Sequence, residues 1–311
     1  MTSCPKVSVI IPVYNRENLI QRSINSVLNQ TYNNIEVIVI DDASTDNTWE
    51  KIKELDDDRI KYYKNDLNKG PSNSRNRGIA LSTGELIAFQ DSDDEWLPQK
   101  LDKQVGKILK SPNEVAAVYC RMTFYDYKSG RKKNENFEVY DFKKYYRNGP
   151  SVQTPAMVTV LIKKTVLDEL GYFDERIKIG EDTELAMRIS KKYSYTFVDE
   201  PLVLVTKNHE QLTNNTEEFI HGREIIYEKH NDFLSRVMLF NICREVSTYY
   251  ILKKEIGKAR YYIVKSFKHK FDFKTLILLA GIITVPFIIK YVYQKKYKGQ
   301  IPVYLNNNTF D

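Results

Sequence analysis

Cysteine is scarce in this sequence, and several features that would point to another class of protein are missing. The three cysteines, Cys4, Cys120 and Cys243, fit neither a disulfide framework nor a zinc-ligand pattern, which indicates a reducing compartment. No charged n-region, long apolar core and cleavage site precede the first apolar run at 7–11, so we expect no secretion signal. The sequence also has no internal repeat and no low-complexity linker. We therefore expect a cytoplasmic globular protein.

Charge is unevenly distributed along the chain. The 311 residues carry a formal net charge of +6, and the sequence pI is about 8.9. The basic residues concentrate late, at Lys253, Lys254, Lys258, Arg260, Lys265, Lys268, Lys270, Lys274, Lys290, Lys295, Lys296 and Lys298. A basic end of this kind favours an anionic partner, either phospholipid or nucleic acid.

Apolar runs alternate with helical patterns through the first third of the chain. Runs at 7–11, 35–40 and 86–89 each suit a buried strand, residues 61–63 suit a short one, and a helical pattern follows each of the four. This alternation predicts an α/β fold with right-handed crossovers and an open, mostly parallel sheet. From about residue 213 the pattern changes to long polar helices. We therefore expect a catalytic domain over 1–210 and a helical C-terminal region over 211–311.

Carboxylates follow directly after the run at 86–89, at Asp91, Asp93 and Asp94. Strand alternation would put Asp91 and Asp93 on one side, close enough to repel unless a cation lies between them. Oxygen ligands favour Mg²⁺ or Mn²⁺, and a metal held by one or two carboxylates is completed by waters and substrate phosphates. The alternative is that Asp94 caps a helix entering through 96–98.

Polar residues also follow the first two strands and begin one helix. The turn at 12–15 and the pair Asp41 and Asp42 stand at carboxyl ends of expected strands, where open α/β sheets bind ligands. These acids would accept from a base N–H or a ribose hydroxyl, or else form a solvated turn. Arg75, in the helix after Gly70, is either solvated or a phosphate ligand.

Two later positions carry groups suited to catalysis. Glu181 and Asp182 stand at the start of an expected helix, either as partners of the helix dipole or with one carboxylate as a general base. His209 follows a short strand and is either a surface histidine or a metal or phosphate ligand.

Five ordered motifs together resemble a known family. The segments are Val7–Asn15, Asp41–Asp46, Ser74–Ile79, Asp91–Asp94 and Gly180–Asp182. They resemble the inverting, nucleotide-sugar-dependent glycosyltransferases of family 2, which have the GT-A fold, and the resemblance covers about residues 5–210. It implies a Rossmann-like, mostly parallel central sheet flanked by helices.

The resemblance also implies roles for donor binding. Arg75 would face the nucleotide, and Asp91, in the D-x-D motif, would reach the ribose. The residues that would hold the nucleoside, most often uridine, are Pro12, Tyr14, Asn15, Asp41 and Asp42.

Metal binding and catalysis are implied at three further positions. Asp93 would bind Mn²⁺ or Mg²⁺ on the donor diphosphate, and His209 stands where many members carry a histidine close to that diphosphate. Asp182, the second residue of the E-D pair, would be the catalytic base. A UDP-sugar would be the donor, and a hydroxyl of a glycan or lipid-linked molecule would be the acceptor, as in bacterial capsule, O-antigen or exopolysaccharide synthesis.

Some features of the family are missing. The Q-x-x-R-W motif and the multiple membrane spans of processive synthases are absent, so transfer of one sugar per encounter is favoured. A glycosidase also uses two carboxylates, but it does not need the nucleotide-type strand ends. The competing hypothesis is an inactive sugar-nucleotide-binding or scaffold protein at the membrane.

The basic end surrounds an apolar segment, Thr275–Ile289, without a charged residue. As a helix it would span only about 22 Å, short of the ~30 Å hydrocarbon core of a membrane. We expect an in-plane or shallowly inserted segment within about 268–298, held against anionic lipid on the inner face of the cell membrane. The alternatives are a helix packed on the protein and a nucleic-acid-binding tail, and we expect no nucleic acid partner.

Overall fold

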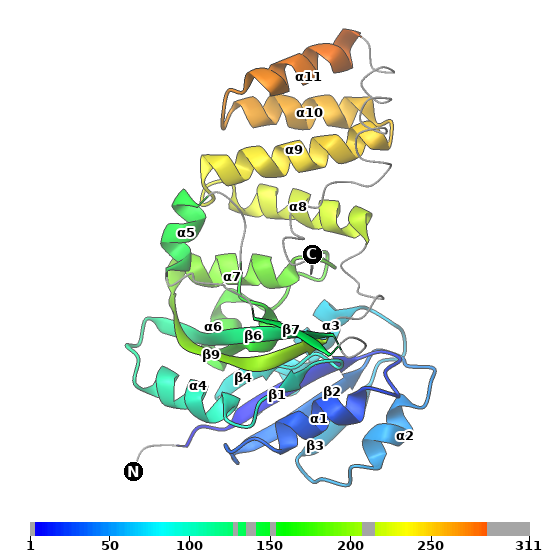
Figure 1. The fold of residues 1–311 in the computed structure, drawn as a ribbon, viewed down its shortest axis with the longest axis vertical. Helices are drawn as coiled ribbons and strands as arrows, with labels where there is room; N and C mark the ends of the chain where they lie inside the picture. The colour runs from blue at the N-terminus through cyan, green and yellow to red at the C-terminus, as the bar shows by residue number, and fades with distance from the viewer. Residues whose placement is uncertain (1–3, 127–129, 135–140, 150–153, 207–214, 285–311) are drawn as a thin grey trace. The chain divides into compact units, whose positions relative to one another are not determined.

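The computed structural model describes residues 4–126, 130–134, 141–149, 154–206 and 215–284. The chain divides into two compact units, described separately below. Unit 1 comprises residues 1–143 and 154–210, and unit 2 comprises residues 144–153 and 211–311 (Figure 1).

The first half of unit 1 is a regular alternation of strands and helices. Its four strands pair in parallel in the order β3-β2-β1-β4, as the apolar runs predict. All seven residues of β2 are buried, because both faces of this sheet are covered. The elements are β1 (Val7–Val13), α1 (Ile20–Leu28), β2 (Ile35–Asp41), α2 (Thr48–Lys53), β3 (Ile60–Lys64), α3 (Pro71–Leu81) and β4 (Leu86–Phe89).

The second half makes the sheet mixed. β8 pairs antiparallel with β4 and β6, whereas β9 pairs antiparallel with β5 and parallel with β6, so the parallel pairs are those among the first four strands and the pair β6–β9. The elements are β5 (Glu95–Trp96), α4 (Lys100–Leu109), β6 (Val115–Asp126), β7 (Arg131–Asn134), β8 (Val160–Lys163), α6 (Lys164–Leu170), α7 (Glu181–Lys192) and β9 (Ser194–Thr206). Helix α5 (Phe142–Asn148) includes residues of both units, because unit 1 ends at 143 and unit 2 begins at 144.

β9 continues through a proline, Pro201. It is one strand whose register against β6 shifts near Arg121, opposite Pro201. Proline cannot donate to a strand ladder, so an irregularity at this point lets the strand continue past it.

The carboxyl ends of β2, β1 and β4 lie along one edge of the sheet. Val13 pairs with Asp41, and Ile10 pairs with Phe89, in parallel register. The acids that follow β2 and β4 therefore leave the sheet on the same side as the turn after β1.

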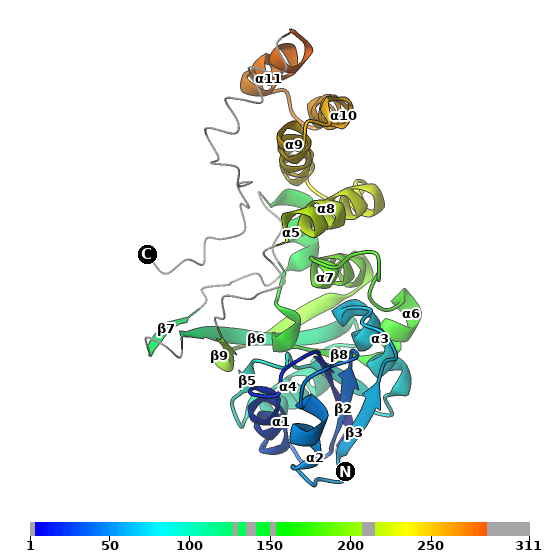
Figure 2. The same cartoon turned by 90° about the vertical axis from the view of Figure 1, so that its right-hand side faces the viewer.

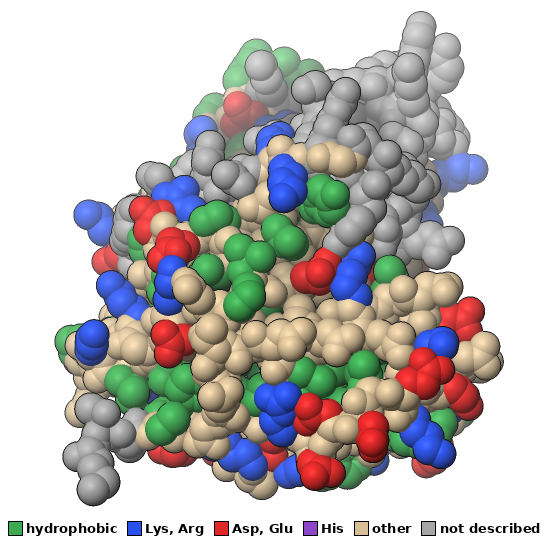
Figure 3. All heavy atoms as spheres, turned by 60° about the horizontal axis from the view of Figure 1, so that its bottom comes forward, with side chains coloured by type: hydrophobic (Ala, Val, Ile, Leu, Met, Phe, Trp, Pro, Cys, Tyr) green, Lys and Arg blue, Asp and Glu red, His purple; other side chains and the backbone are tan. Residues whose placement is uncertain are grey.

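On the face shown in Figure 3, acidic and basic side chains are interspersed over the described surface.

Unit 2 is helical. Its helices α8 (Thr216–His230), α9 (Arg236–Leu252), α10 (Ile256–Phe267) and α11 (Phe273–Thr284) follow one another in a stack, with α9 packed between α8 and α10 (Figure 2). Within the part of the chain that the structure describes, no helix has the length and apolar character to span a membrane. The segment expected at 275–289 is helical up to 284, and 285–289 lies outside the described residues.

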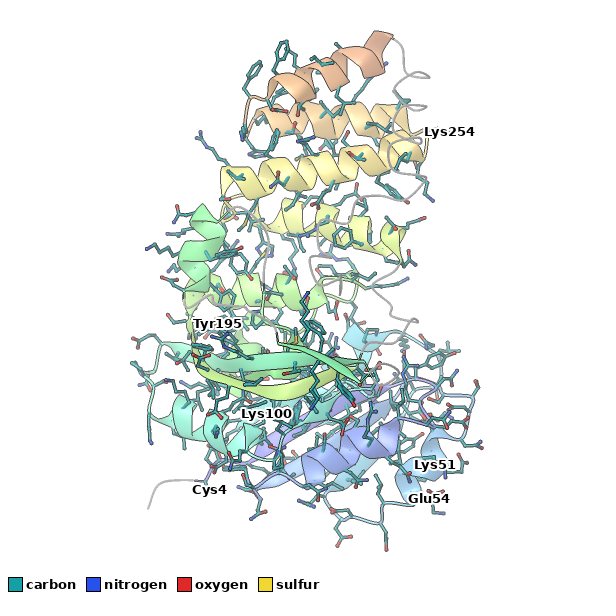
Figure 4. The ribbon with its side chains drawn as sticks, viewed as in Figure 1. Cys4, Lys51, Glu54, Lys100, Tyr195 and Lys254 are labelled. Carbon is teal, nitrogen blue, oxygen red and sulfur yellow. The ribbon has the colours of Figure 1, made fainter. Side chains whose placement is uncertain are left out.

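A lysine is buried between α4 and the sheet in unit 1 (Figure 4). The Nζ of Lys100 donates to Gln104 Oε1 at 2.8 Å and lies 3.8 Å from the centroid of the Trp96 ring. Burial lowers the pKa of Lys100 to about 8. The charged form is therefore held in the core at a cost in stability.

Replacing Lys100 with Met is expected to raise the free energy of unfolding at neutral pH by ~1–3 kcal/mol. An unfolded lysine keeps its proton up to a higher pH than the folded one, so wild-type stability rises between about pH 8 and pH 10. The advantage of the variant should shrink over the same range. Urea unfolding at neutral and alkaline pH measures both effects, with Lys107→Met on the exposed side of α4 as the control. A variant less stable than wild type at neutral pH would contradict this account.

Candidate active site

The acidic segment between β4 and β5 is held in place by helix α1. Ser23 Oγ donates to the backbone oxygen of Asp91 at 2.8 Å, and Arg22 Nη2 donates to the backbone oxygen of Asp93 at 2.7 Å. These bonds satisfy carbonyls that leave the strand ladder where β4 ends. The carboxylates are thus attached to a rigid turn rather than to an open loop.

Arg75 links this segment to the start of α7. Its Nη2 donates to Asp91 Oδ1 at 3.0 Å, and its Nη1 donates to Glu181 Oε1 at 2.7 Å. The guanidinium carbon lies 5.6 Å from the centroid of the Phe173 ring, and the whole side chain is buried. Burial by itself would lower the pKa of Arg75, but the two carboxylates raise it above its ordinary value. One guanidinium therefore joins an acid after β4 to an acid on α7.

The Nε of Arg75 has no acceptor among the described residues, although it is buried. The expected role of Arg75 is to face the nucleotide, and this stays a prediction. In the structure, both terminal guanidinium nitrogens of Arg75 already form ion pairs with protein carboxylates.

Asp94 is not a helix cap, so the alternative interpretation of the acidic segment is wrong. Its Oδ1 accepts from the backbone N–H of Thr206 in β9 at 2.9 Å. Strand β5 follows it, and α4 begins only at Lys100. The Asp94 carboxylate is therefore bonded to Thr206, which is 112 residues away in the sequence, and a local sequence pattern cannot show such a partner.

The acidic segment has the chemistry of a site for a hard cation. Burial raises the pKa of Asp93, and the Asp91 carboxylate raises it further, with Arg16 and Arg22 opposing. Burial raises the pKa of Asp94 as well, and the carboxylates of Asp91 and Asp93 raise it further. Crowded carboxylate oxygens with unbalanced negative charge fit Mg²⁺ or Mn²⁺.

The expected metal ligands are only partly described. Among the described residues, no three His, Cys, Asp or Glu side chains form a metal-binding group. His209, the second expected ligand, lies outside the described residues. The metal roles of Asp93 and His209 stay predictions.

Asp182 follows Glu181 in the first turn of α7. The helix starts after Gly180, whose φ of +92° is a conformation that favours glycine. Asp182 Oδ1 accepts from the backbone N–H of Thr183 at 2.6 Å. Burial raises the pKa of Asp182, with Thr183 and Arg75 opposing. A half-buried carboxylate with a raised pKa suits proton transfer better than an ordinary aspartate does, and its role as catalytic base stays a prediction.

The turn after β1 is tied to the segment after β2. The backbone N–H of Asn15 donates to Ser44 Oγ at 2.9 Å, and Asn15 Oδ1 accepts from the N–H of Thr45 at 2.8 Å. Asn15 has a φ of +50°, and Tyr14 is exposed. Pro12, the last of the expected residues here, lies within β1.

Asp41 and Asp42 are buried and bonded within unit 1. Asp41 accepts from the N–H of Ser44 and from the hydroxyl of Tyr62. Asp42 accepts from the backbone N–H groups of Lys69 and Gly70, directly before α3, and from Asn65 Nδ2. The solvated turn considered from the sequence is therefore wrong, whereas the nucleoside-binding role stays a prediction.

Sequence reasoning missed the groups that support the site from outside the motifs. Arg22 and Ser23 interrupt the apolar pattern of α1, and Ser23 is completely buried. A serine buried among apolar helix positions needs a hydrogen-bond partner, so this break in the pattern was the available signal. No feature of the sequence pointed to Phe173, which packs on Arg75.

Comparisons with known proteins agree with this architecture. The model of the family described as "Glycosyl transferase family 2" matches residues 8–171, more than half of the chain. The chain is 46% identical over 113 residues to the Escherichia coli UDP-Glc:alpha-D-GlcNAc-diphosphoundecaprenol beta-1,3-glucosyltransferase WfgD, which covers 36% of this chain and 44% of WfgD. It is 32% identical over 222 residues to an uncharacterized glycosyltransferase of Rickettsia typhi, covering 69% and 68%. Thus the match spans less than half of WfgD and about two thirds of the Rickettsia protein.

Two solved structures show the fold. Staphylococcus aureus TarS 1–349 in complex with UDP-GlcNAc superposes with a TM-score of 0.67 at 19% identity, covering 94% of this chain and 91% of that one. The Pyrobaculum calidifontis mannosyltransferase PcManGT in complex with GDP-Man and Mn²⁺ gives 0.60 at 17% identity, covering 98% and 89%. The GT-A-like α/β fold expected from the sequence is confirmed. Because the family model matches more than half of the chain and the Rickettsia typhi relative aligns over about two thirds of its length, this chain belongs to glycosyltransferase family 2.

Proposed function

We propose that this chain is a metal-dependent, inverting glycosyltransferase that moves a sugar from a UDP-sugar to a hydroxyl of a glycan or lipid-linked acceptor. The observation that carries the proposal is the Arg75 bridge, because it joins Asp91 of the acidic segment to the helix start that bears Asp182. A transferase needs its leaving-group site and its base at one place. Bacterial capsule, O-antigen or exopolysaccharide synthesis is the proposed setting.

Asp182 is assigned the proton transfer. It takes the proton from the acceptor hydroxyl as that oxygen attacks the anomeric carbon, and the bond from that carbon to the diphosphate breaks on the opposite face. The direct displacement inverts the anomeric centre, so an α-linked donor gives a β-linked product. The raised pKa of Asp182 supports this role, because a base is most effective when its pKa approaches the working pH.

The strand ends are assigned the donor nucleotide. Asp41 and Asp42 would accept from the uracil and the ribose, and each oxygen of Asp41, which accepts one hydrogen bond within unit 1, has a second lone pair for this. Pro12, Tyr14 and Asn15 would line the same pocket from the turn after β1.

The cation is assigned to Asp93 and to His209. When bound, Mg²⁺ or Mn²⁺ would neutralise charge on the leaving diphosphate as a Lewis acid. The support is the crowding of Asp91, Asp93 and Asp94, whose mutual repulsion a hard cation would relieve. Asp91 would keep its bond to Arg75 and reach the ribose.

The relatives suggest which substrates to try first. WfgD is named for a UDP-glucose donor and a GlcNAc-diphosphoundecaprenol acceptor, so UDP-glucose and a GlcNAc-diphospho-lipid are the first pair. A lipid-linked acceptor implies work at a membrane surface, and we place the protein peripherally on the inner face of the cell membrane.

A UDP-release assay tests the proposal. We expect acceptor-dependent release of UDP from one of a panel of UDP-sugars when Mg²⁺ or Mn²⁺ is present, loss of release with EDTA, and recovery when the cation is restored. The anomeric coupling constant in the NMR spectrum of the product should report inversion. Nucleotide binding without turnover on any pair would instead support the inactive sugar-nucleotide-binding protein.

A further inference from the structure

Four large apolar side chains stand exposed around the start of α11 in unit 2. The exposed fractions are 70% for Phe271, 67% for Phe273, 38% for Leu276 and 55% for Ile277. Thr275 and Leu278 of the same helix are buried instead. The helix therefore uses one side for packing and presents the other to the surroundings. Exposed apolar residues grouped in this way mark an interaction surface.

The same region is strongly basic. Residues 256–281 contain six Lys or Arg and one acidic residue, Asp272. Its carboxylate accepts from both the N–H and the hydroxyl of Thr275, so it caps α11. Lys268 and Lys270 are exposed, and Lys270 directly precedes Phe271 in the chain. The exposed apolar side chains therefore stand next to cations in the sequence.

We propose that Phe271, Phe273, Leu276 and Ile277 form a docking surface for an anionic phospholipid bilayer. The four side chains enter the boundary between head groups and acyl chains, and Lys268 and Lys270 contact lipid phosphates. The twelve described residues of α11 span about 18 Å, less than the ~30 Å hydrocarbon core, and we assign this part of the helix to the plane of the membrane.

Charge argues against a second copy of this chain as the occupant. A two-fold interface sets a patch against its own copy, so two basic patches that each contain Lys268 and Lys270 would be brought together. An anionic lipid surface satisfies the lysines and the apolar residues together. This inference deepens the proposed function by naming the surface that would bring the enzyme to a lipid-linked acceptor. It also rests on that function for its purpose, although its test does not measure sugar transfer.

Sedimentation of the full chain with vesicles tests the proposal. Vesicles of phosphatidylcholine alone are compared with vesicles that also contain phosphatidylglycerol, and we expect at least about tenfold stronger partitioning to the anionic vesicles. Added salt should weaken that preference. Equal binding to both vesicle types, or no binding, would overturn the proposal whether or not the chain transfers sugar.

Matched variants separate the two parts of the surface. Phe271→Ser with Phe273→Ser and Ile277→Ser should lower partitioning at least about tenfold, because the inserted groups are lost. Lys268→Gln with Lys270→Gln should remove most of the preference for anionic lipid. Leu109→Ser, at an exposed apolar residue of α4, should bind as wild type does. All of these sites are exposed, and circular dichroism confirms that each variant is folded. Wild-type binding by the apolar variant, or a dimer in light scattering that this variant abolishes, would overturn the lipid assignment.

Discussion

Replacing Asp182 with Asn is expected to lower kcat by ~10²–10⁴, the usual contribution of a positioned general base. The substitution keeps size and the capacity to accept the N–H of Thr183, but it removes the group that takes the proton. The loss should appear in kcat, because Asp182 acts on the proton of the acceptor hydroxyl only during the chemical step.

The pH dependence gives a second measurement at the same residue. A base must be deprotonated to act, so kcat/KM of the wild type should rise with pH through the pKa of Asp182. Burial raises that pKa, so the rise should lie above the ordinary aspartate value of about 3.9. The Asn variant should lack this rise in its residual activity.

Binding measurements distinguish catalysis from affinity. Calorimetry should give the same Kd for UDP in the Asn variant as in the wild type, since Asp182 is assigned to the acceptor side. Asp102→Asn, an exposed carboxylate of α4, is the matched control and should leave kcat unchanged. A loss of less than about tenfold in the Asp182 variant would remove it as the base.

Replacing Arg75 with Met is expected to lower both stability and activity. Removing one partner of a buried ion pair leaves uncompensated charge and costs about 3–5 kcal/mol. Here two carboxylates, Asp91 and Glu181, would lose the same cation, at contacts of 3.0 and 2.7 Å. The acidic segment and the start of α7 would no longer be joined, so kcat should fall at least about 10²-fold.

The stability loss should depend on pH in a defined direction. Burial already raises the pKa of Glu181, and Arg75 opposes that rise. Without Arg75 the folded-state pKa moves further above its unfolded value, so the folded state takes up protons and is stabilised by acid. The variant should therefore lose stability, relative to wild type, as the pH rises from about 4 to above neutrality.

Two further variants test whether the fork itself matters. Arg75→Lys keeps the charge but cannot hold two carboxylates with a planar fork, so we expect an intermediate loss. Arg176→Met removes an exposed arginine that pairs with Asp174, and it should change stability by less than about 1 kcal/mol. Thermal unfolding and UDP release measure the set. If Arg75→Met were as stable as the wild type, the ion pairs of Arg75 would contribute nothing to the stability of the fold.

Much of the candidate site could be predicted because its residues stand at ends of regular elements. The buried runs before Asp41 and Asp91 predict strands, and parallel strands bring their carboxyl ends to one edge. The mixed second half of the sheet was harder to predict. β6 extends over 12 residues and β9 over 13, across Pro201, because pairing partners rather than local propensity decide such lengths.

By itself the sequence determined the strand–helix alternation, the acidic and amide groups at the strand ends, and the family to which these motifs belong. Only the tertiary structure decided the partners of those groups: Arg75 bonds to Asp91 and also to Glu181, 106 residues further along the chain, and Asp94 bonds to Thr206 instead of capping a helix. The reason is physical. Periodicity and strand-end chemistry are local properties, whereas a buried charge is stabilised by whichever opposite charge or N–H the fold brings within hydrogen-bond distance.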